Sequence, residues 1–413
     1  MALLTTVDQV LSSASNALMV FALAQVSSAP QFGIIALLIT VLAVWTGFNR
    51  GALGTPLLLT SNLSARQITA ESGYAVSWSL WTALLGGVVF IGGGAAFGQP
   101  TVGLAFALTL PAVLAQDVLR HSAISLGRPA LAVLADGLWT AAVLILFVAN
   151  LCGAHESAES AIYLWGLSGL VSAVLLAARC AVAPRHWRIL QWWNTYWRPR
   201  MRFASVYSVG QVGLVLVTLV ALTTAGSVAA AGIRGAWTLF GPVGMLISAM
   251  PTVFVPQAAR NRDDGPGEHW RPVRTTSLVT SVLTIVAATG LMAVPATLGA
   301  AVLGATWTEA SSLIPYLGVA AAAMCWLVGA FTYFSAQGAS KTVFRLNLMH
   351  IGLQVTSSLA AGVLFNSAAA IAIAIAASSC VMAVAGVACV HFHIRAATSI
   401  SSTLSSFGRV AVQ

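Results

Sequence analysis

The stretch VAAAGIRGAWTLFGPVGMLISAMPTVFVP, residues 228–256, decides the fold class of this chain. It is apolar throughout except for one charged side chain, Arg234. A run of about 20 apolar residues is long enough to cross the ~30 Å hydrocarbon core of a bilayer as a helix. The stretch therefore predicts a membrane-spanning helix. The ionised Arg234 inside it predicts a site for an anionic ligand, because a charge within hydrocarbon is costly and rarely kept without a function.

Similar apolar stretches recur along the whole chain. Of its 413 residues, 58% are hydrophobic and only 7% are charged, whereas about a quarter of the residues are charged in an ordinary soluble domain. We expect an all-α polytopic membrane protein with about twelve transmembrane helices and no separate soluble domain. The twelve segments have approximate bounds 5–26, 31–50, 73–97, 102–126, 129–151, 159–181, 203–224, 227–255, 276–298, 312–334, 343–365 and 368–391.

Positive charge marks one side of the membrane. Every Lys and Arg other than Arg234 falls in or beside the connections after the second, fourth, sixth, eighth and tenth segments, or in the C-terminal tail. Because Lys and Arg are retained in cytoplasmic loops, both termini are predicted to be cytoplasmic. The net charge of +9 does not indicate a nucleic-acid partner, since the arginines are scattered rather than gathered on one domain.

The longest inward connection divides the chain into two sets of six segments. We predict an N-terminal lobe over 1–182, an interfacial amphipathic connector over 183–202, a C-terminal lobe over 203–395 and a cytoplasmic tail over 396–413. Two lobes facing a central cavity are the usual plan of an alternating-access carrier. In the connector, Trp187, Leu190, Trp193 and Trp197 form an apolar stripe flanked by arginines, which is typical of a helix in the headgroup layer. It is either a lever between the lobes or an anchored linker.

Polar side chains inside the apolar segments are the candidate ligands. Arg234 lies on the order of 10 Å below the outer surface at the rise of a helix; it either binds an anionic group in a cavity or extends its stem outward to water. Its planar guanidinium suits a diphosphate. Asn16 and Gln211 lie near mid-depth of the first and seventh segments. Such amides either line a sugar-binding cavity or join helices by hydrogen bonds.

Two acidic residues, Asp117 and Asp136, lie near the cytoplasmic ends of the fourth and fifth segments. They are candidates for coupling transport to a proton or cation gradient. The alternative is that Asp117 pairs with Arg120 one turn on and that Asp136 finds a basic partner. We predict no metal site and no cofactor, since His391 and His393 have no third ligand nearby in the sequence and the five cysteines show no CxxC spacing.

Three passages resemble Wzx-like polysaccharide exporters of the multidrug, oligosaccharidyl-lipid and polysaccharide (MOP) exporter superfamily, whose fold is MATE-like. DQVLSSASNALMVFALAQVSSAPQFGIIALLITVLAVWTGFNRGALG is similar to the first two helices of that family. LPAVLAQDVLRHSAISLGRPALAVLADGLW is similar to the fourth and fifth, and GIRGAWTLFGPVGMLISAMPTVFVPQAAR to the eighth. The resemblance covers most of the first half and the eighth helix.

The resemblance implies a flippase of the bacterial inner membrane. It implies alternating access between two six-helix lobes and a cationic cavity that takes the head group of a polyprenyl-diphosphate-linked oligosaccharide, with Arg234 at the position of the family's cavity arginine. Membrane lipids, the lipid-linked glycan and a polymerase or glycosyltransferases of the same pathway are the implied partners. The lipid II branch of the superfamily has further helices and several arginines in its first two helices, whereas this chain has none there before Arg50.

Other functions stay open from the sequence. A cation-coupled small-molecule or drug exporter of the same superfamily would depend on Asp117 or Asp136. A membrane-embedded glycosyltransferase or ligase would need acidic residues or a sizeable loop on the outer face, and the outer connections here are short and carry no paired carboxylates. We therefore expect a carrier rather than an enzyme, with no catalytic residues.

Overall fold

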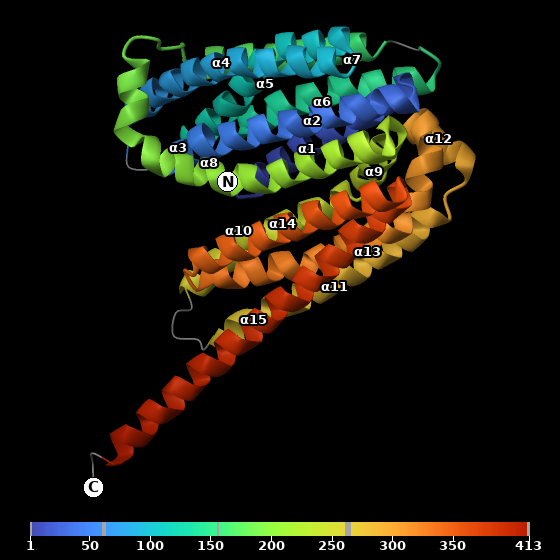
Figure 1. Cartoon of the computed structure of the whole chain (residues 1–413). Coiled ribbons are helices and arrows are strands. Elements are labelled where there is room, and N and C mark those ends of the chain that lie inside the picture. The colour runs from blue at the N-terminus through green and yellow to red at the C-terminus, as the bar shows by residue number, and fades with distance from the viewer. Residues whose placement is uncertain (1, 60–62, 155–156, 261–265, 411–413) are drawn as a thin grey trace. The chain divides into compact units, whose positions relative to one another are not determined.

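The computed structural model describes residues 2–59, 63–154, 157–260 and 266–410 (Figure 1). Every regular element in these ranges is a helix. Eleven helices are long and apolar enough to cross a membrane, or up to twelve if the pair α9 and α10 is one broken span. The prediction of an all-α polytopic membrane protein with about twelve spans is confirmed.

Most of the long helices coincide with the predicted segments, but α8 and α11 begin well before the predicted starts at 203 and 276, and α15 continues beyond 391. Their bounds are α1 Ala2–Val26, α2 Ala29–Asn49, α4 Ala65–Ala96, α5 Pro100–Ser125, α6 Pro129–Leu151, α7 Ala158–Cys180, α8 Ile189–Val220, α9 Ser227–Leu239, α10 Gly241–Arg260, α11 Pro266–Met292, α13 Trp307–Ala336, α14 Ser340–Phe365 and α15 Ala368–Val410. Short elements join them: the π-helices η1 Arg50–Gly54 and η2 Ala221–Ala225, the helices α3 Thr55–Leu58 and α12 Ala296–Leu303, and the 3-10 turn η3 Gly304–Thr306.

Three further differences from the predicted boundaries have local reasons. α4 begins eight residues early, at Ala65, because Ser64 and Gln67 form a capping box that satisfies the first backbone N–H groups. α11 ends at Met292 rather than near 298, since Pro295 starts the separate helix α12. The segment predicted as one helix over 227–255 is two helices interrupted at Phe240, just before Gly241 and Pro242, where a proline is tolerated at the start of a helix.

The chain divides into two compact units. Unit 1 comprises Met1–Thr238 and Pro295–Ala310, and unit 2 comprises Leu239–Val294 and Ser311–Gln413. These boundaries differ from those of the lobes 1–182 and 203–395, and the two-lobe division stays a prediction about how the protein moves.

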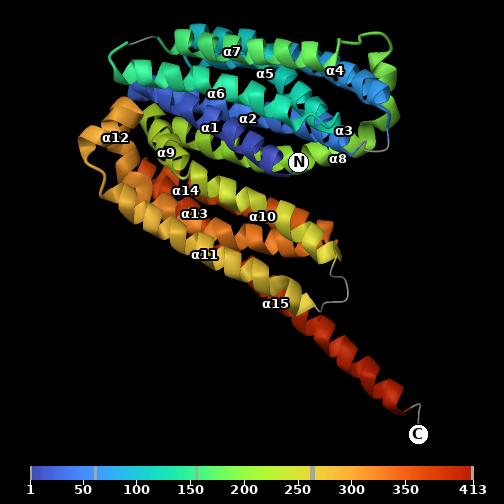
Figure 2. The ribbon, with the colours of Figure 1, turned by 180° about the vertical axis from the view of Figure 1, so that it is seen from behind.

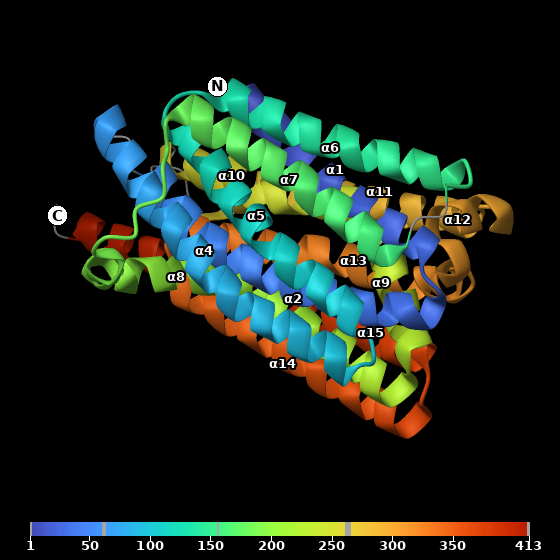
Figure 3. The ribbon, with the colours of Figure 1, turned by 90° about the horizontal axis from the view of Figure 1, so that it is seen from above.

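In unit 1 the helices approach closely through small residues. α4 packs along α5, α1 along α6, and α2 along α8; Figure 2 shows α1 beside α6, and Figure 3 shows α4 beside α5. A Cβ added to Gly94 of α4 would lie 2.7 Å from the Cα of Gly103 in α5, and one added to Gly51 of η1 would lie 2.5 Å from the Cα of Ala204 in α8. Such bare backbone contacts are what allow helices to associate tightly in lipid.

The predicted connector 183–202 includes the first residues of α8, which begins at Ile189, and these residues are docked on α4. Trp193 stacks on Trp78 with ring centroids 4.2 Å apart, and the indole N–H of Trp192 donates to Glu71 at 2.7 Å. The guanidinium of Arg200 lies 3.8 Å from the Trp192 ring centroid. Burial of Arg200 lowers its pKa to about 10 despite the nearby Glu71 carboxylate.

The predicted apolar stripe of the connector is only partly outward. Trp187, Leu190 and Trp197 are exposed, whereas Trp193 is part of the contact with α4. The exposed members are those suited to a headgroup layer. The role of the connector as an interfacial anchor or lever stays a prediction.

Unit 2 has its own apolar core between α11, α13, α14 and α15. Its centre is formed by Trp270, Leu327, Tyr333, Leu346 and Met382. The Trp270 and Tyr333 rings meet edge to face with centroids 5.8 Å apart, an arrangement that aromatic pairs favour.

Candidate functional site

Unit 1 encloses a cavity of about 250 Å³ between α1, α2, α5, α6, α7, α8 and α9. Its apolar wall includes Trp139 and Trp165, whose ring centroids are 5.5 Å apart. Its polar wall brings together side chains from α1, η1, α5, α8 and α9: Asn16, Arg50, Gln116, Asp117, Gln211 and Arg234. We call this the unit 1 cavity.

Arg234 reaches the unit 1 cavity because the other faces of α9 are built from small, buried residues. Gly232, Gly235 and Ala236 are buried, and a Cβ added to Gly235 would lie 3.1 Å from Thr306 of η3. This close packing holds α9 so that the arginine is turned to the cavity. Within the described residues the Nε atom of Arg234 is buried without a hydrogen-bond partner. The side chain is thus a cavity-lining cation rather than a stem extended outward to water.

Asn16 and Gln211 both line the same cavity, from α1 and α8. The amide Nδ2 of Asn16 donates to the carbonyl of Ser12 at 3.0 Å, within its own helix. The sequence alone left two roles open for these amides, lining a cavity or joining helices by hydrogen bonds. Their position on the cavity wall leaves amide oxygens and nitrogens able to meet a polar ligand.

Arg50 is the cavity residue that sequence reasoning missed as a ligand. In the sequence it is the last residue of the segment 31–50, beside a predicted cytoplasmic connection, but in the structure α2 continues through η1 and α3 to Leu58. Arg50 therefore lies inside a continuous helical span, where it lines the cavity and its Nε donates to Asp117 at 2.9 Å. The apolar run that continues after it, GALGTPLLL, was the signal that could have found it.

Asp117 and Asp136 belong to one buried network centred on Arg120. One terminal nitrogen of Arg120 contacts Asp136 at 3.3 Å and Asp8 at 3.4 Å, and the other contacts Asp117 at 3.4 Å. The three carboxylates come from α1, α5 and α6. The sequence left open that Asp117 pairs with Arg120 and that Asp136 has a basic partner. The structure has both ion pairs, and Arg120 is the partner of both carboxylates.

The network touches the unit 1 cavity at two points. Asp117 and Gln116 line the cavity, and the Gln116 amide donates to Asp136 at 2.6 Å. Asp136 does not line the cavity itself and is joined to it through Gln116. Three carboxylates face two guanidinium groups, those of Arg120 and Arg50, so the fully ionised cluster has an unbalanced negative charge. Burying such a charge is costly.

No metal site emerges from the part of the chain that the structure describes, where no group of three or more His, Cys, Asp or Glu side chains could hold an ion. The five cysteines are free thiols. The Nδ1 atom of His391 lies 2.8 Å from the carbonyl of Val387, in its own helix.

Comparison with known proteins identifies the fold. No family model and no curated protein sequence matches the chain. Among solved structures, a multidrug resistance MATE-family transporter of the MOP superfamily, in an inward-facing conformation, superposes with a TM-score of 0.69 at 16% identity over 95% of this chain and 96% of that one. The lipid II flippase MurJ superposes with a TM-score of 0.73 at 10% identity, over 95% and 88%.

A MOP superfamily transporter from Pyrococcus furiosus gives a TM-score of 0.58 at 15% identity, over 96% and 95% of the two chains. These similar structures are transporters and a flippase rather than enzymes. At such identities the likeness concerns the fold alone, and it agrees with the count of spans. The chain is a multi-pass membrane protein with the fold of the MOP superfamily of transporters.

Proposed function

We propose that this protein is a Wzx-like flippase that moves a polyprenyl-diphosphate-linked oligosaccharide from the inner to the outer leaflet of a bacterial plasma membrane by alternating access, for assembly of a cell-surface polysaccharide. The observation that carries the proposal is the unit 1 cavity, where Arg234 lies among amide side chains without a carboxylate partner in the described residues.

The chemistry of the cavity suits the polar head of such a lipid. Moving a diphosphate and sugars through hydrocarbon unaided is prohibitive, because neither group can keep its hydrogen bonds there. Arg234 supplies a planar pair of donors for the diphosphate, and Arg50 supplies a second cation on the same wall. Asn16 and Gln211 can hydrogen-bond a sugar.

The cavity volume limits what is bound at one time. Cavities that hold a drug-sized ligand are roughly 300–1,000 Å³, and the unit 1 cavity is about 250 Å³. It has room for a diphosphate and an adjoining sugar rather than for a whole oligosaccharide. Recognition by this chain therefore concerns the part of the lipid shared by many glycans.

Coupling to a gradient has a physical basis in the Arg50–Asp117 pair. A proton on Asp117 removes the charge that holds Arg50, which frees that guanidinium for an anionic ligand. Asp136, linked to the cavity by Gln116, is the second candidate. The same carboxylates would favour a cationic drug in a cation-coupled exporter, and Asp117 on the cavity wall is the observation for that second candidate.

The test is the lipid pool of cells depleted of the protein. We expect a lipid-linked glycan to accumulate on the inner leaflet and to disappear when the wild-type gene is restored. Arg234→Ala should fail to restore export at normal protein level, because the anion-binding cation is gone. Arg66→Ala removes an exposed arginine away from the cavity and should restore export fully. An unchanged lipid pool on depletion would overturn the proposal.

A further inference from the structure

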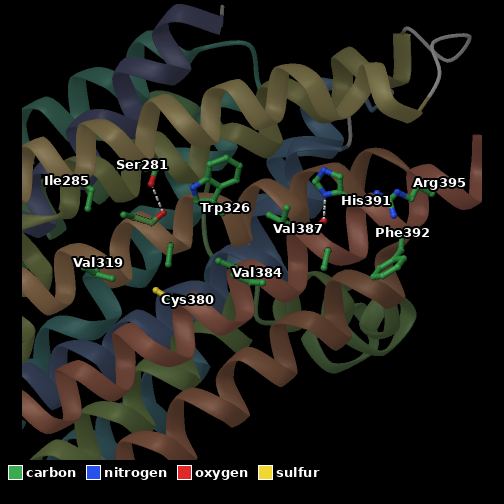
Figure 4. A pocket seen from close by; sticks show the side chains of 14 residues that line it. Ser281, Ile285, Val319, Trp326, Cys380, Val384, Val387, His391, Phe392 and Arg395 are labelled. Atoms are coloured by element: carbon green, nitrogen blue, oxygen red, sulfur yellow. Dashed lines mark hydrogen bonds between the residues drawn. The ribbon is translucent and has the colours of Figure 1, made fainter.

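A second hollow lies entirely within unit 2. It is a groove of about 720 Å³. Figure 4 shows the side chains of α11, α13 and α15 that line it. Most of its wall is apolar, including Ile285, Val319, Trp326 and Val384. The hydroxyl of Ser281 is already engaged, since it donates to the carbonyl of Ala322 at 3.2 Å. We call this the unit 2 groove; its middle is suited to hydrocarbon.

One end of the unit 2 groove is basic. His391, Phe392 and Arg395 lie there, at the end of the span Ala368–Ala396, and Figure 4 shows Cys380, Val319 and Ile285 toward the other end. Arg395 is exposed. The groove therefore presents a positive charge at the membrane boundary and an apolar channel deeper in.

The length of the groove matches one leaflet. Cys380 and Arg395 lie on the same helix, α15, so their separation along its axis is about 22 Å at the helical rise. Half of a bilayer, headgroup layer included, is about 20–22 Å deep. A groove of this length fits a single acyl chain with its headgroup phosphate at the basic end, whereas a polyprenyl chain is much longer than one leaflet is deep.

We propose that the unit 2 groove binds one acyl chain of an anionic membrane phospholipid, whose phosphate pairs with Arg395. An acyl chain that leaves the bilayer for an apolar groove gains no hydrophobic stabilisation, because both surroundings are apolar. Selection must therefore come from the charged end. Both kinds of lipid offer a phosphate to Arg395, but the quaternary ammonium of a choline lipid places a second positive charge near the guanidinium. This like-charge repulsion gives the anionic lipid a preference of about tenfold.

Two native cysteines of α15 make the test direct. Cys380 lines the groove, whereas Cys389 is exposed on the same helix and lies outside the lining. The purified full chain in detergent is treated with N-ethylmaleimide while phosphatidylglycerol or phosphatidylcholine is added, and modification of each cysteine is followed by mass spectrometry. We expect phosphatidylglycerol to slow labelling of Cys380 at about tenfold lower concentration than phosphatidylcholine, with Cys389 unchanged.

Variants separate the charged end from the apolar channel. Arg395→Gln should remove the preference for phosphatidylglycerol, whereas Arg345→Gln, at an exposed arginine of α14 outside the groove, should keep it. Val384→Trp fills the groove from an exposed position and should abolish protection by lipid, and Val363→Trp, equally exposed on α14, should not.

Three results would overturn the proposal: equal protection by the two phospholipids, a preference that survives Arg395→Gln, or protection of Cys380 by a polyprenyl phosphate but not by phosphatidylglycerol. The last result would assign the groove to the tail of a polyprenyl substrate.

Discussion

Arg234 combines a fixed position with a chemistry that lysine does not share. Its guanidinium offers parallel donors to a diphosphate, while an ammonium is a point charge on a flexible stem. We expect Arg234→Lys to keep part of the transport that Arg234→Ala loses, at a rate lowered by about tenfold through the loss of one charge-assisted hydrogen bond. Uptake of a fluorescent lipid-linked sugar into the far leaflet of proteoliposomes measures this. Equal rates for Lys and Arg would mean that charge alone matters there.

Arg120 has a structural role that is separate from Arg234. It holds carboxylates from three helices, and removing one partner of a buried ion pair leaves charge uncompensated. We expect Arg120→Met to lower the free energy of unfolding by about 3–5 kcal/mol, measured by denaturation in mixed micelles. Arg66→Met, at an exposed position, should leave the unfolding free energy unchanged. Stability retained in Arg120→Met would show that the carboxylates find other partners.

Asp117 is the residue whose change should separate transport from its driving force. Asp117→Asn keeps the shape of the side chain but no longer charge-pairs with Arg50. We expect this variant to let substrate equilibrate across vesicles yet to lose accumulation driven by an imposed proton or sodium gradient. The control is Glu159→Gln, at a carboxylate in the first turn of α7 that accepts a hydrogen bond from Thr101 at the start of α5. Accumulation that survives in Asp117→Asn would exclude this carboxylate from coupling.

Much of the cavity wall was visible in the sequence, residue by residue. Charged and amide side chains are expensive in apolar segments, so Asn16, Asp117, Gln211 and Arg234 stood out, and the structure places them on one wall. Arg50 could not be recognised in the same way. It lies at the end of a predicted segment, where a basic residue is equally typical of a cytoplasmic loop. Nor could the sequence show that Asp8, Asp117 and Asp136 share one arginine, since that depends on three helices meeting.

At the scale of elements, the π-helix η1 positions Arg50 at the cavity, and its packing against α8 depends on the close contact between Gly51 and Ala204. A Cβ at Gly51 would press on the backbone of Ala204, and backbone cannot move aside as a flexible side chain can. We expect Gly51→Ala to cost about 1–3 kcal/mol of stability through overpacking and to reduce transport, measured by thermal unfolding and the proteoliposome assay.

The matched control is Gly92→Ala on α4, where an added Cβ meets nothing within 4 Å. This variant should be as stable as the wild type or slightly more so, because alanine favours a helix over glycine. Equal stability and equal transport in the two alanine variants would show that η1 and α8 can move apart at Gly51, and that this contact is not tight in the membrane.

Hydropathy was enough to place the spans but not their ends or breaks. Length and apolarity predicted each long helix because the bilayer imposes one thickness on all of them. The ends are set by local hydrogen bonds, as at Ser64, and by prolines, as at Pro295. The break between α9 and α10 lies inside an apolar run, so hydropathy passes over it, and only the Gly241–Pro242 pair marks it in the sequence.

At the scale of the whole molecule, the orientation in the membrane is a prediction from loop charge alone. We expect a fluorescent protein fused after the C-terminus to fold, as it does in the cytoplasm, and alkaline phosphatase inserted after Gly153 to be active, as it is outside. The reciprocal fusions should be inactive. Activity of alkaline phosphatase at the C-terminus would reverse the assigned direction of transport as well as the topology.

The Arg120 network also constrains how the chain can be made. Asp8 and Arg120 are 112 residues apart in sequence, and translation proceeds at about 5–20 residues per second, so α1 is synthesised on the order of ten seconds before its counter-charge exists. During that interval Asp8 lacks the guanidinium that it contacts in the folded chain. Asp8 therefore either stays protonated in the bilayer or waits with α1 at the insertion machinery until α5 is made.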